Sequence, residues 1–185
     1  PTPNAGDQFG LSVASVGANV LVGAPRDDAG GTDAGAAYLF DGTTGALLQT
    51  FMKPTPAAAD QFGMSVGAMG GNVLIGAIKD ATLGVKHGAV YLFDTSGLLL
   101  ETFLNPSPAL DDDFGWTVTS VGANVLVGAP RDDSAGSPGF DSGQAHLFGG
   151  TGFLLQTFEK PAPASRDVFG YSVAALDAST LLMGT

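Results

Sequence analysis

The sequence predicts an all-β fold, a β-propeller built of four-stranded antiparallel blades. Phe-Gly recurs at spacings of 53, 52 and 55 residues, and its copies lie at Phe9, Phe62, Phe114 and Phe169. In each full period, Gly- and Pro-containing turns separate four short apolar segments. A period of roughly 50 residues with four strands is typical of propeller blades, which bury their faces only against their neighbours.

The first repeat shows how each strand, named A to D in chain order, is predicted. Residues 11–16 alternate large apolar and small side chains, which favours a strand A with one buried face. Residues 20–24 form an unbroken apolar run, so strand B is expected to be buried on both faces. Pro25 ends strand B because proline has no backbone donor for a sheet. Strands C and D follow at residues 36–40 and 47–51, joined by a hairpin turn.

The same pattern assigns the whole chain, residues 1–185, to one domain. Strands are expected at 64–69, 72–77, 89–93 and 98–103 in the second repeat, and at 116–121, 124–129, 144–148 and 153–158 in the third. The repeats run over about 7–59, 60–111 and 112–166, and a partial repeat, 167–185, supplies strands A and B only. Closed propellers have roughly four to eight blades. We therefore expect part of a larger ring or array, whose open end faces self-associate.

Ten of the twelve phenylalanines occupy repeat-equivalent positions. Four belong to Phe-Gly, three end strand C and three end strand D. A ring at a fixed place in every repeat is what stacked blades need, so these side chains are expected to pack between blades. Trp116 takes the position of Leu11 and Met64, and we assign it the same role.

The composition restricts the functional classes. Apolar residues make up 44% of the chain and charged residues 14%, so the glycines and prolines are turn residues of a folded chain. The net charge of −11 repels nucleic acid phosphates and anionic membranes, so no nucleic acid partner is expected. No apolar run approaches ~18 residues, which argues against membrane insertion. The absence of cysteine excludes disulfides and thiol chemistry.

Two motifs carry a family resemblance. Phe9-Gly10 is followed by Gly23-Ala24-Pro25, and Phe114-Gly115 by Gly128-Ala129-Pro130; both resemble FG-GAP repeats, which build the β-propeller of integrin alpha subunits. The resemblance implies a radial array, seven-bladed in integrins. It also implies that ligands contact the loops between strands B and C (B–C loops) and the linkers from strand D to the next repeat (D–A linkers). Here these are residues 26–35 and 53–60, with their equivalents.

The sequence departs from the family at its usual metal site. Many members carry a calcium loop of spaced Asp and Asn residues between Phe-Gly and Gly-Ala-Pro. In this chain that connection is only residues 16–19, Val-Gly-Ala-Asn. Too few oxygen ligands remain there for the six to eight that Ca²⁺ needs. We therefore expect the family's usual calcium site to be absent from the full repeats.

Acidic residues cluster instead in the B–C loops of repeats one and three. With a flanking Arg in each loop, they are the candidate binding residues: Arg26, Asp27, Asp28, Asp33, Arg131, Asp132, Asp133 and Asp141. In the second repeat Asp80 keeps the position of Asp27, but Ala81 and Lys86 replace the other two acids. The joint loss of two acids and gain of a base suggests that these acids share a cation or a hydrogen-bond network.

Two interpretations of these loops remain open. In one, their acids bind Ca²⁺; the candidate ligands are Asp27, Asp28, Asp33, Asp132, Asp133 and Asp141, and no other cofactor is assigned. In the other, each Asp caps a turn by accepting hydrogen bonds from nearby backbone N–H groups, while Arg26, Lys79 and Arg131 offset the charge. The most divergent insertion, residues 134–140, is where substitutions are expected to alter partner binding.

Enzyme chemistry has little support in the sequence. His87 and His146 have no carboxylate or Ser partner that is independent of the repeat, so each is interpreted as a surface or core histidine. Asp111, Asp112 and Asp113 form an acidic run in a Pro-flanked linker. Exposed consecutive acids would have nearly normal pKa values, so we expect a solvated turn rather than a pair of general acids and bases.

These observations favour a non-catalytic interaction or adhesion module of a bacterial surface or secreted protein. An extracellular or cell-surface location is expected, with a protein or surface glycan as ligand. The alternative is a structural subunit of an extracellular filament or surface layer, which would polymerise in solution. A hydrolase or lyase on a propeller would require convergent polar groups in a pocket, and the sequence indicates none.

Overall fold

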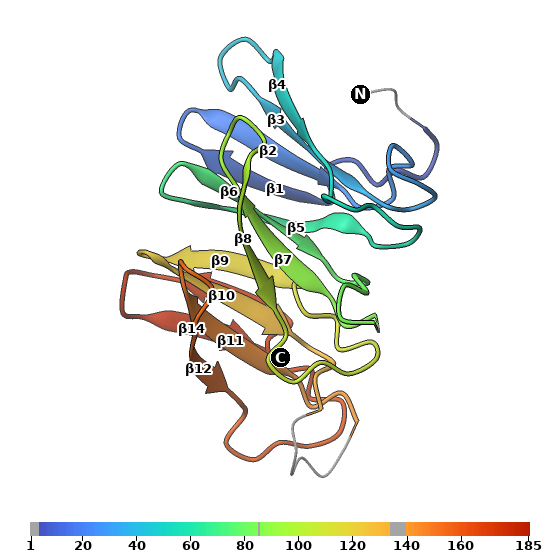
Figure 1. Ribbon diagram of the computed structural model, residues 1–185. Coiled ribbons are helices and arrows are strands. Elements are labelled where there is room, and N and C mark those ends of the chain that lie inside the picture. Colours follow the sequence, from blue (N-terminus) through green and yellow to red (C-terminus); the bar gives the residue numbers. More distant parts are fainter. Residues whose placement is uncertain (1–3, 85, 134–139) are drawn as a thin grey trace.

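The computed structural model describes residues 4–84, 86–133 and 140–185, in which fourteen β-strands form four antiparallel sheets (Figure 1). Blade 1 comprises β1 (Ser12–Val16), β2 (Asn19–Ala24), β3 (Ala36–Phe40) and β4 (Leu47–Phe51). Blade 2 comprises β5 (Phe62–Met69), β6 (Asn72–Ala77), β7 (Ala89–Phe93) and β8 (Leu99–Leu104). Blade 3 comprises β9 (Thr117–Val121), β10 (Asn124–Ala129), β11 (Gln144–Gly149) and β12 (Leu154–Phe158). A half-blade contains β13 (Ser172–Ala175) and β14 (Leu181–Gly184).

Each full blade is a simple meander in which every strand pairs with the next along the chain. The predicted all-β, blade-like fold is therefore confirmed, with strand boundaries within two residues of expectation. The largest difference is β5, which begins at Phe62 instead of Met64. Phe62 pairs with Ala77 before an irregularity in the register, and it also bridges to Gly35 of blade 1. The neighbouring repeat thus extends this strand, which sequence periodicity within one repeat does not reveal.

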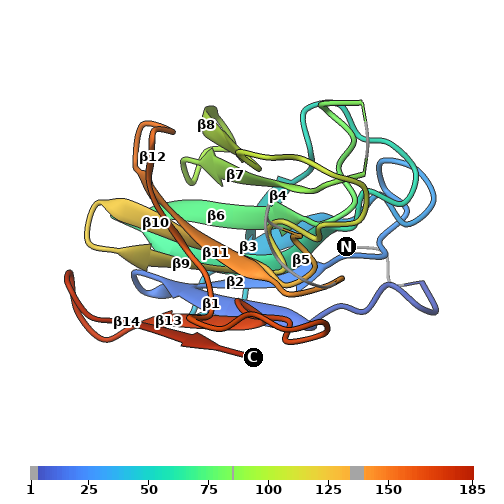
Figure 2. The same ribbon diagram turned by 90° about the horizontal axis from the view of Figure 1, so that it is seen from below.

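The blades follow one another in chain order as a propeller-like array (Figures 1 and 2). The first strands of successive blades, β1, β5, β9 and β13, are neighbours in series. In the described part of the chain, no helix has the length and apolar character needed to cross a membrane.

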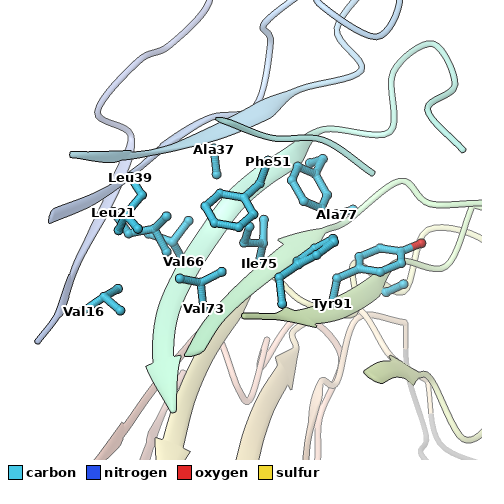
Figure 3. Close-up of a cluster of buried hydrophobic side chains, with 13 residues drawn as sticks. Val16, Leu21, Ala37, Leu39, Phe51, Val66, Val73, Ile75, Ala77 and Tyr91 are labelled. Atoms are coloured by element: carbon cyan, nitrogen blue, oxygen red, sulfur yellow. The ribbon is translucent and has the colours of Figure 1, made fainter. Parts of the chain in front are cut away.

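The core lies between blades. Figure 3 shows the cluster that joins blades 1 and 2, in which Leu39 and Phe51 of blade 1 belong with Val73 and Ile75 of blade 2. A second cluster joins blades 2 and 3, and a third joins blade 3 to the half-blade. Because every large cluster spans a junction, the apolar surface of a blade is buried only when its neighbour is present.

The aromatic side chains follow this arrangement. The ring of Phe51 packs at a tilt against that of Phe93 across the first junction, with centroids 5.6 Å apart, and Phe103 and Phe148 make the equivalent contact at the second. The predicted packing of phenylalanines between blades is confirmed at these positions. Phe9 instead packs within blade 1 and remains about half exposed, because no described blade covers that face.

Trp116 also behaves as the repeats predict. Its ring lies 5.3 Å from that of Tyr171, which begins the half-blade. The contact crosses the junction between blade 3 and the half-blade, so the expected inter-blade role of Trp116 is confirmed.

The paired glycine motifs form the contact between adjacent blades. Gly23, in Gly-Ala-Pro of blade 1, lies against Gly63, in Phe-Gly of blade 2, and a Cβ built on Gly23 would overlap the carbonyl oxygen of Gly63. The hydroxyl of Ser12 donates to the same oxygen at 2.9 Å. Ser65 and Thr117 donate in the same way to Gly115 and Gly170, at 2.7 and 3.2 Å. The two halves of the motif therefore join neighbouring blades as well as the strands of one blade.

Candidate functional site

The B–C loops and D–A linkers lie at the same end of the sheets and form one surface, which we call the loop face (Figure 1). Each B–C loop is bonded to the linker that follows its blade: Gln61 N donates to Asp33 O and Phe62 N to Ala34 O. The same pairing recurs between residues 86–87 and 111–114, and between 140–142 and 166–169. Each loop is also bonded to the linker that precedes its blade, as in the bond from Arg26 N to Asp7 O. Backbone hydrogen bonds therefore fix the loop face on both sides.

Asp27 is buried and caps the first B–C loop. Its Oδ1 accepts the backbone N–H of Ala29 at 2.8 Å, and its Oδ2 accepts the hydroxyl of Tyr38 at 2.5 Å. Asp80 of blade 2 accepts the N–H of Thr82 and the hydroxyl of Tyr91 at 2.6 and 2.5 Å. Burial raises the pKa of both tyrosines, and the neighbouring carboxylate raises it further because it opposes the phenolate.

The remaining candidates of the first loop are more accessible to solvent. The carboxylate of Asp28 accepts the backbone N–H of Asp33 at 2.9 Å, which is a second capping bond. Arg26 is exposed. The equivalent Asp133 and Arg131 of the third loop are exposed as well. The predicted binding residues thus separate into three groups: Asp27 and Asp132 are buried, Asp33 and Asp141 are half-buried, and the exposed set comprises Arg26, Asp28, Arg131 and Asp133.

The geometry supports turn capping at these acids. Both carboxylate oxygens of Asp27 already accept hydrogen bonds from protein donors. Within residues 4–84, 86–133 and 140–185, no three or more His, Asp or Glu side chains are grouped so that they could hold a metal ion. Calcium binding by the B–C loops stays a prediction, because most of the insertion 134–140 lies outside the described residues.

The flanking cations pair with acids other than those expected. Lys79 donates to Asp111 and Asp113 of the following linker at 2.8 and 2.6 Å. Arg131 lies 3.4 Å from Asp113 as well. The prediction that these side chains offset the charge of the B–C loop acids is therefore wrong for both. The linker folds back against the loop and places its own carboxylates closer to the cations.

A buried ion bridge, which the sequence reasoning missed, crosses the junction between blades 1 and 2. Lys53, just after β4, lies 2.9 Å from the carboxylates of both Asp60 and Asp80. All three side chains are buried. Burial alone would lower the pKa of Lys53, but its bonds to Asp80 and Asp60 raise that pKa overall. Bonds from Thr82, Tyr91 and Lys53 likewise outweigh burial at Asp80 and lower its pKa.

The junction between blades 2 and 3 has the same geometry without the cation. Asn105 occupies the position of Lys53, and its Nδ2 donates to Asp112 at 2.8 Å and to Asp132 at 2.9 Å. His146 takes the place of Tyr91, with Nε2 3.5 Å from Oδ2 of Asp132. This buried Nε2 has no hydrogen-bond partner among the described residues. His146 is thus a core histidine, one of the two alternatives that the sequence left open.

The prediction of a solvated turn at residues 111–113 is wrong for two of the three acids. Asp112 and Asp113 are each only 2% exposed, because the linker is covered by the loops to which it bonds. Burial raises the pKa of Asp112 to about 7, and the negative charges of Asp132, Asp133 and Asp113 act in the same direction. Burial also raises the pKa of Asp113, against the opposing effect of Lys79. Asp111 is exposed, and Lys79 lowers its pKa.

The sequence contains a recurring pattern at the residues that form these bridges. Lys53, Asn105 and Lys160 each precede a proline after strand D, and each is followed seven residues later by an Asp. Lys160 donates to that residue, Asp167, at 2.8 Å, as Lys53 does in the first junction. The recurring Lys/Asn-Pro pair therefore marked the bridging residue of the first two junctions, and at the third it marks Lys160, which bonds to Asp167 of the same linker.

The fold and the loop face together define a class: a propeller-like repeat protein whose loops at one end of the blades are joined into a single fixed surface. A family model described as the FG-GAP repeat matches residues 3–40, 54–93 and 107–148, more than half of the chain. The chain belongs to the FG-GAP repeat family, whose repeats are typical of extracellular or surface proteins. Each match begins in a linker and ends with strand C, so it includes the loop and the linker that bond to one another. No curated protein matches the chain.

Proposed function

We propose that this chain is a non-catalytic interaction or adhesion module of a bacterial surface or secreted protein, and that it binds a protein or a surface glycan. The structure of the loop face is the observation that supports this proposal. Backbone bonds hold each B–C loop between two linkers, while Arg26, Asp28, Arg131 and Asp133 remain accessible to solvent. Polar loops on a rigid scaffold are the usual location of binding residues.

The placement of the titratable groups supports binding in preference to catalysis. Buried acids of the loop face are used in bridges between blades, such as the pair that Lys53 joins, or in capping bonds within a blade, as at Asp27. A hollow of about 440 Å³ lies elsewhere, between blade 3 and the half-blade. Its lining is mainly apolar and includes Leu147, Phe158 and Met183. It therefore offers few groups that could transfer protons or attack a substrate.

A binding experiment tests the proposed function. The immobilised chain is probed with a printed glycan array and with solubilised surface proteins of the source cells. We expect Arg26→Ala combined with Arg131→Ala, and separately Asp28→Ala combined with Asp133→Ala, to weaken capture at least tenfold with the melting temperature little changed. About 1.4 kcal/mol of lost binding energy gives that tenfold effect.

The matched controls lie at the opposite end of the blades. Ala18→Ser and Ala123→Ser change exposed positions in the A–B turns and should leave capture unchanged. Loss of capture in these controls but not in the loop variants would place the binding surface at the wrong end and contradict the proposal.

A second candidate function is a structural subunit of an extracellular filament or surface layer. The two end faces favour it. Phe9, Leu11 and Val13 are exposed on blade 1, and Leu176 and Leu182 on the half-blade. Contiguous exposed apolar side chains and an unpaired strand edge promote association. A second copy of this chain is the occupant that we propose for these faces.

A further inference from the structure

We propose that the junction between blades 2 and 3 is a proton-dependent joint, in which Asp112, bridged by Asn105 to Asp132, holds a proton where the preceding junction holds the ammonium of Lys53. The inference is independent of the function proposed above. It rests on two junctions that share one geometry and differ in charge.

The bridging atom is charged in the first junction and neutral in the second. In the first junction the ammonium of Lys53 lies 2.9 Å from two carboxylates, so two negative charges meet one positive charge. In the second, the bridging atom is the amide nitrogen of Asn105, at nearly the same distances from Asp112 and Asp132. An amide donates hydrogen bonds but carries no charge. With both acids ionised, the second junction therefore carries one more net negative charge than the first.

The ring beside the loop acid also differs between the two junctions. Tyr91 of the first junction donates its hydroxyl to Asp80 at 2.5 Å. His146 replaces it in the second, and its Nε2 lies 3.5 Å from Asp132 without a hydrogen-bond partner among the described residues. Asp132 therefore lacks the hydroxyl donor that Asp80 receives from Tyr91.

The charges around the site leave it without another cation. Asp112 faces the negative charges of Asp132, Asp133 and Asp113. The nearest cations, Lys79 and Arg131, contact Asp113, and Lys79 also contacts Asp111. Among the described residues, these cations form no ion pair with Asp112 or Asp132. Two buried carboxylates that are both ionised without a cation repel each other and are poorly solvated, so uptake of one proton is favoured.

The direction of the pH effect follows from the Asp112 carboxyl, whose pKa burial raises from 3.8 to about 7. Between these values the folded protein retains a proton that the unfolded chain has released. The contribution to stability is therefore complete below pH ~4 and is lost as the pH rises through about 7. The joint between blades 2 and 3 therefore weakens above neutral pH.

Urea unfolding from about pH 5 to about pH 8 tests the proposal, because one extra bound proton changes the unfolding constant by up to about tenfold per pH unit. The decisive variants are Asn105→Lys, which copies the first junction, and Asp112→Asn, which removes the titrating group. In the wild type the unfolding constant should change by up to about tenfold per pH unit below pH ~7, and both variants should lose this pH dependence. Asp112→Asn should also lower the unfolding constant at pH ~8, since it removes a buried charge.

The matched control is Asp60→Asn in the first junction. It removes one partner of Lys53 and should raise the unfolding constant at pH ~8, the opposite sign to Asp112→Asn. Carbon-13 NMR of the aspartate carboxyls gives an answer even if a variant fails to fold. A wild-type Asp112 resonance that titrates near its ordinary pKa, with none of this pH dependence lost in Asn105→Lys, would overturn the proposal. A midpoint near 7 supports it.

Discussion

At the residue scale, one position has three environments. The Asp that begins each B–C loop, Asp27, Asp80 or Asp132, is buried in every full repeat. The side chains that surround it differ. Asp27 accepts from Tyr38, Asp80 accepts from Tyr91 and Lys53, and Asp132 accepts from Asn105 and lies beside His146. The sequence placed these acids in loops and left calcium binding and turn capping open. It did not predict their burial, because the residues that cover them come from another part of the repeat pattern.

We predict that Tyr38→Phe destabilises the protein by about 1–3 kcal/mol, because it leaves a buried carboxylate oxygen of Asp27 without its donor. Urea denaturation measures the change. Tyr171→Phe is the control, since the Tyr171 side chain is half exposed and should change stability little. A Tyr38→Phe variant as stable as wild type would contradict this role of Asp27.

The same measurement distinguishes the two interpretations of the loop acids. If the carboxylates cap turns, a calcium chelator should leave the transition of the wild-type protein unchanged, and that is the result we expect. If chelation lowers the melting temperature and Asp28→Ala removes the effect, the loops bind calcium and the capping bonds describe only the metal-free protein.

At the element scale, the contact between a B–C loop and the following linker depends on the glycine before strand C. Gly35 has φ of +85°, and a Cβ built on it would overlap the backbone of Phe62. Gly88 and Gly143 meet Phe114 and Phe169 in the same way. A side chain at any of these positions would separate the loop from the linker, and the loop face would lose its support.

We therefore predict that Gly35→Ala destabilises the protein by more than the roughly 1–2 kcal/mol that a left-handed conformation costs an ordinary residue. Gly45→Ala is the matched control: its φ is +72°, but a Cβ there has no neighbour within 4 Å. Urea unfolding of the two variants separates strain from overlap. Equal destabilisation would show that the contact with Phe62 has no energetic role.

The elements also show where sequence reasoning succeeds. Strands were predictable because each carries its own periodicity, and β2 and β6 are buried along most of their lengths as an unbroken apolar run requires. The burial of the D–A linkers could not be predicted in this way. In the sequence, Asp112 and Asp113 belong to a polar run in a Pro-flanked linker. Their burial depends on backbone bonds to a loop more than twenty residues away in the chain, such as the bond from Phe114 N to His87 O.

At the scale of the whole molecule, blade 1 and the half-blade each carry one half of the inter-blade contact, unmatched among the described residues. Ser172 is the fourth-repeat equivalent of Ser12, whose hydroxyl donates to the Phe-Gly carbonyl of the next blade. Gly10 belongs to the Phe-Gly of blade 1, and a Cβ built there would have no neighbour within 4 Å. The half-blade thus presents the donor, and blade 1 the acceptor, of a bond that recurs within the chain.

We predict concentration-dependent, head-to-tail association of the chain, measured by light scattering. Val13→Asp on blade 1 or Leu182→Asp on the half-blade should shift the protein toward monomer, since each places a charge on an exposed apolar end face. Leu98→Asp, at an exposed position away from both ends, is the control and should not. A wild-type protein that stays monomeric at all concentrations would rule out association through these faces and, with it, the structural-subunit alternative.

The hydroxyl-to-glycine bond between blades also bears on how such chains can change in length. Every junction uses the same donor position and the same acceptor position, and the copies of Phe-Gly lie 52 to 55 residues apart. Duplication or deletion of one complete period leaves each hydroxyl donor with a glycine carbonyl acceptor. A change of half a period would leave a donor or an acceptor without its partner. Genetic gain or loss of whole blades therefore preserves the hydroxyl-to-glycine bond at every junction, whatever the number of blades.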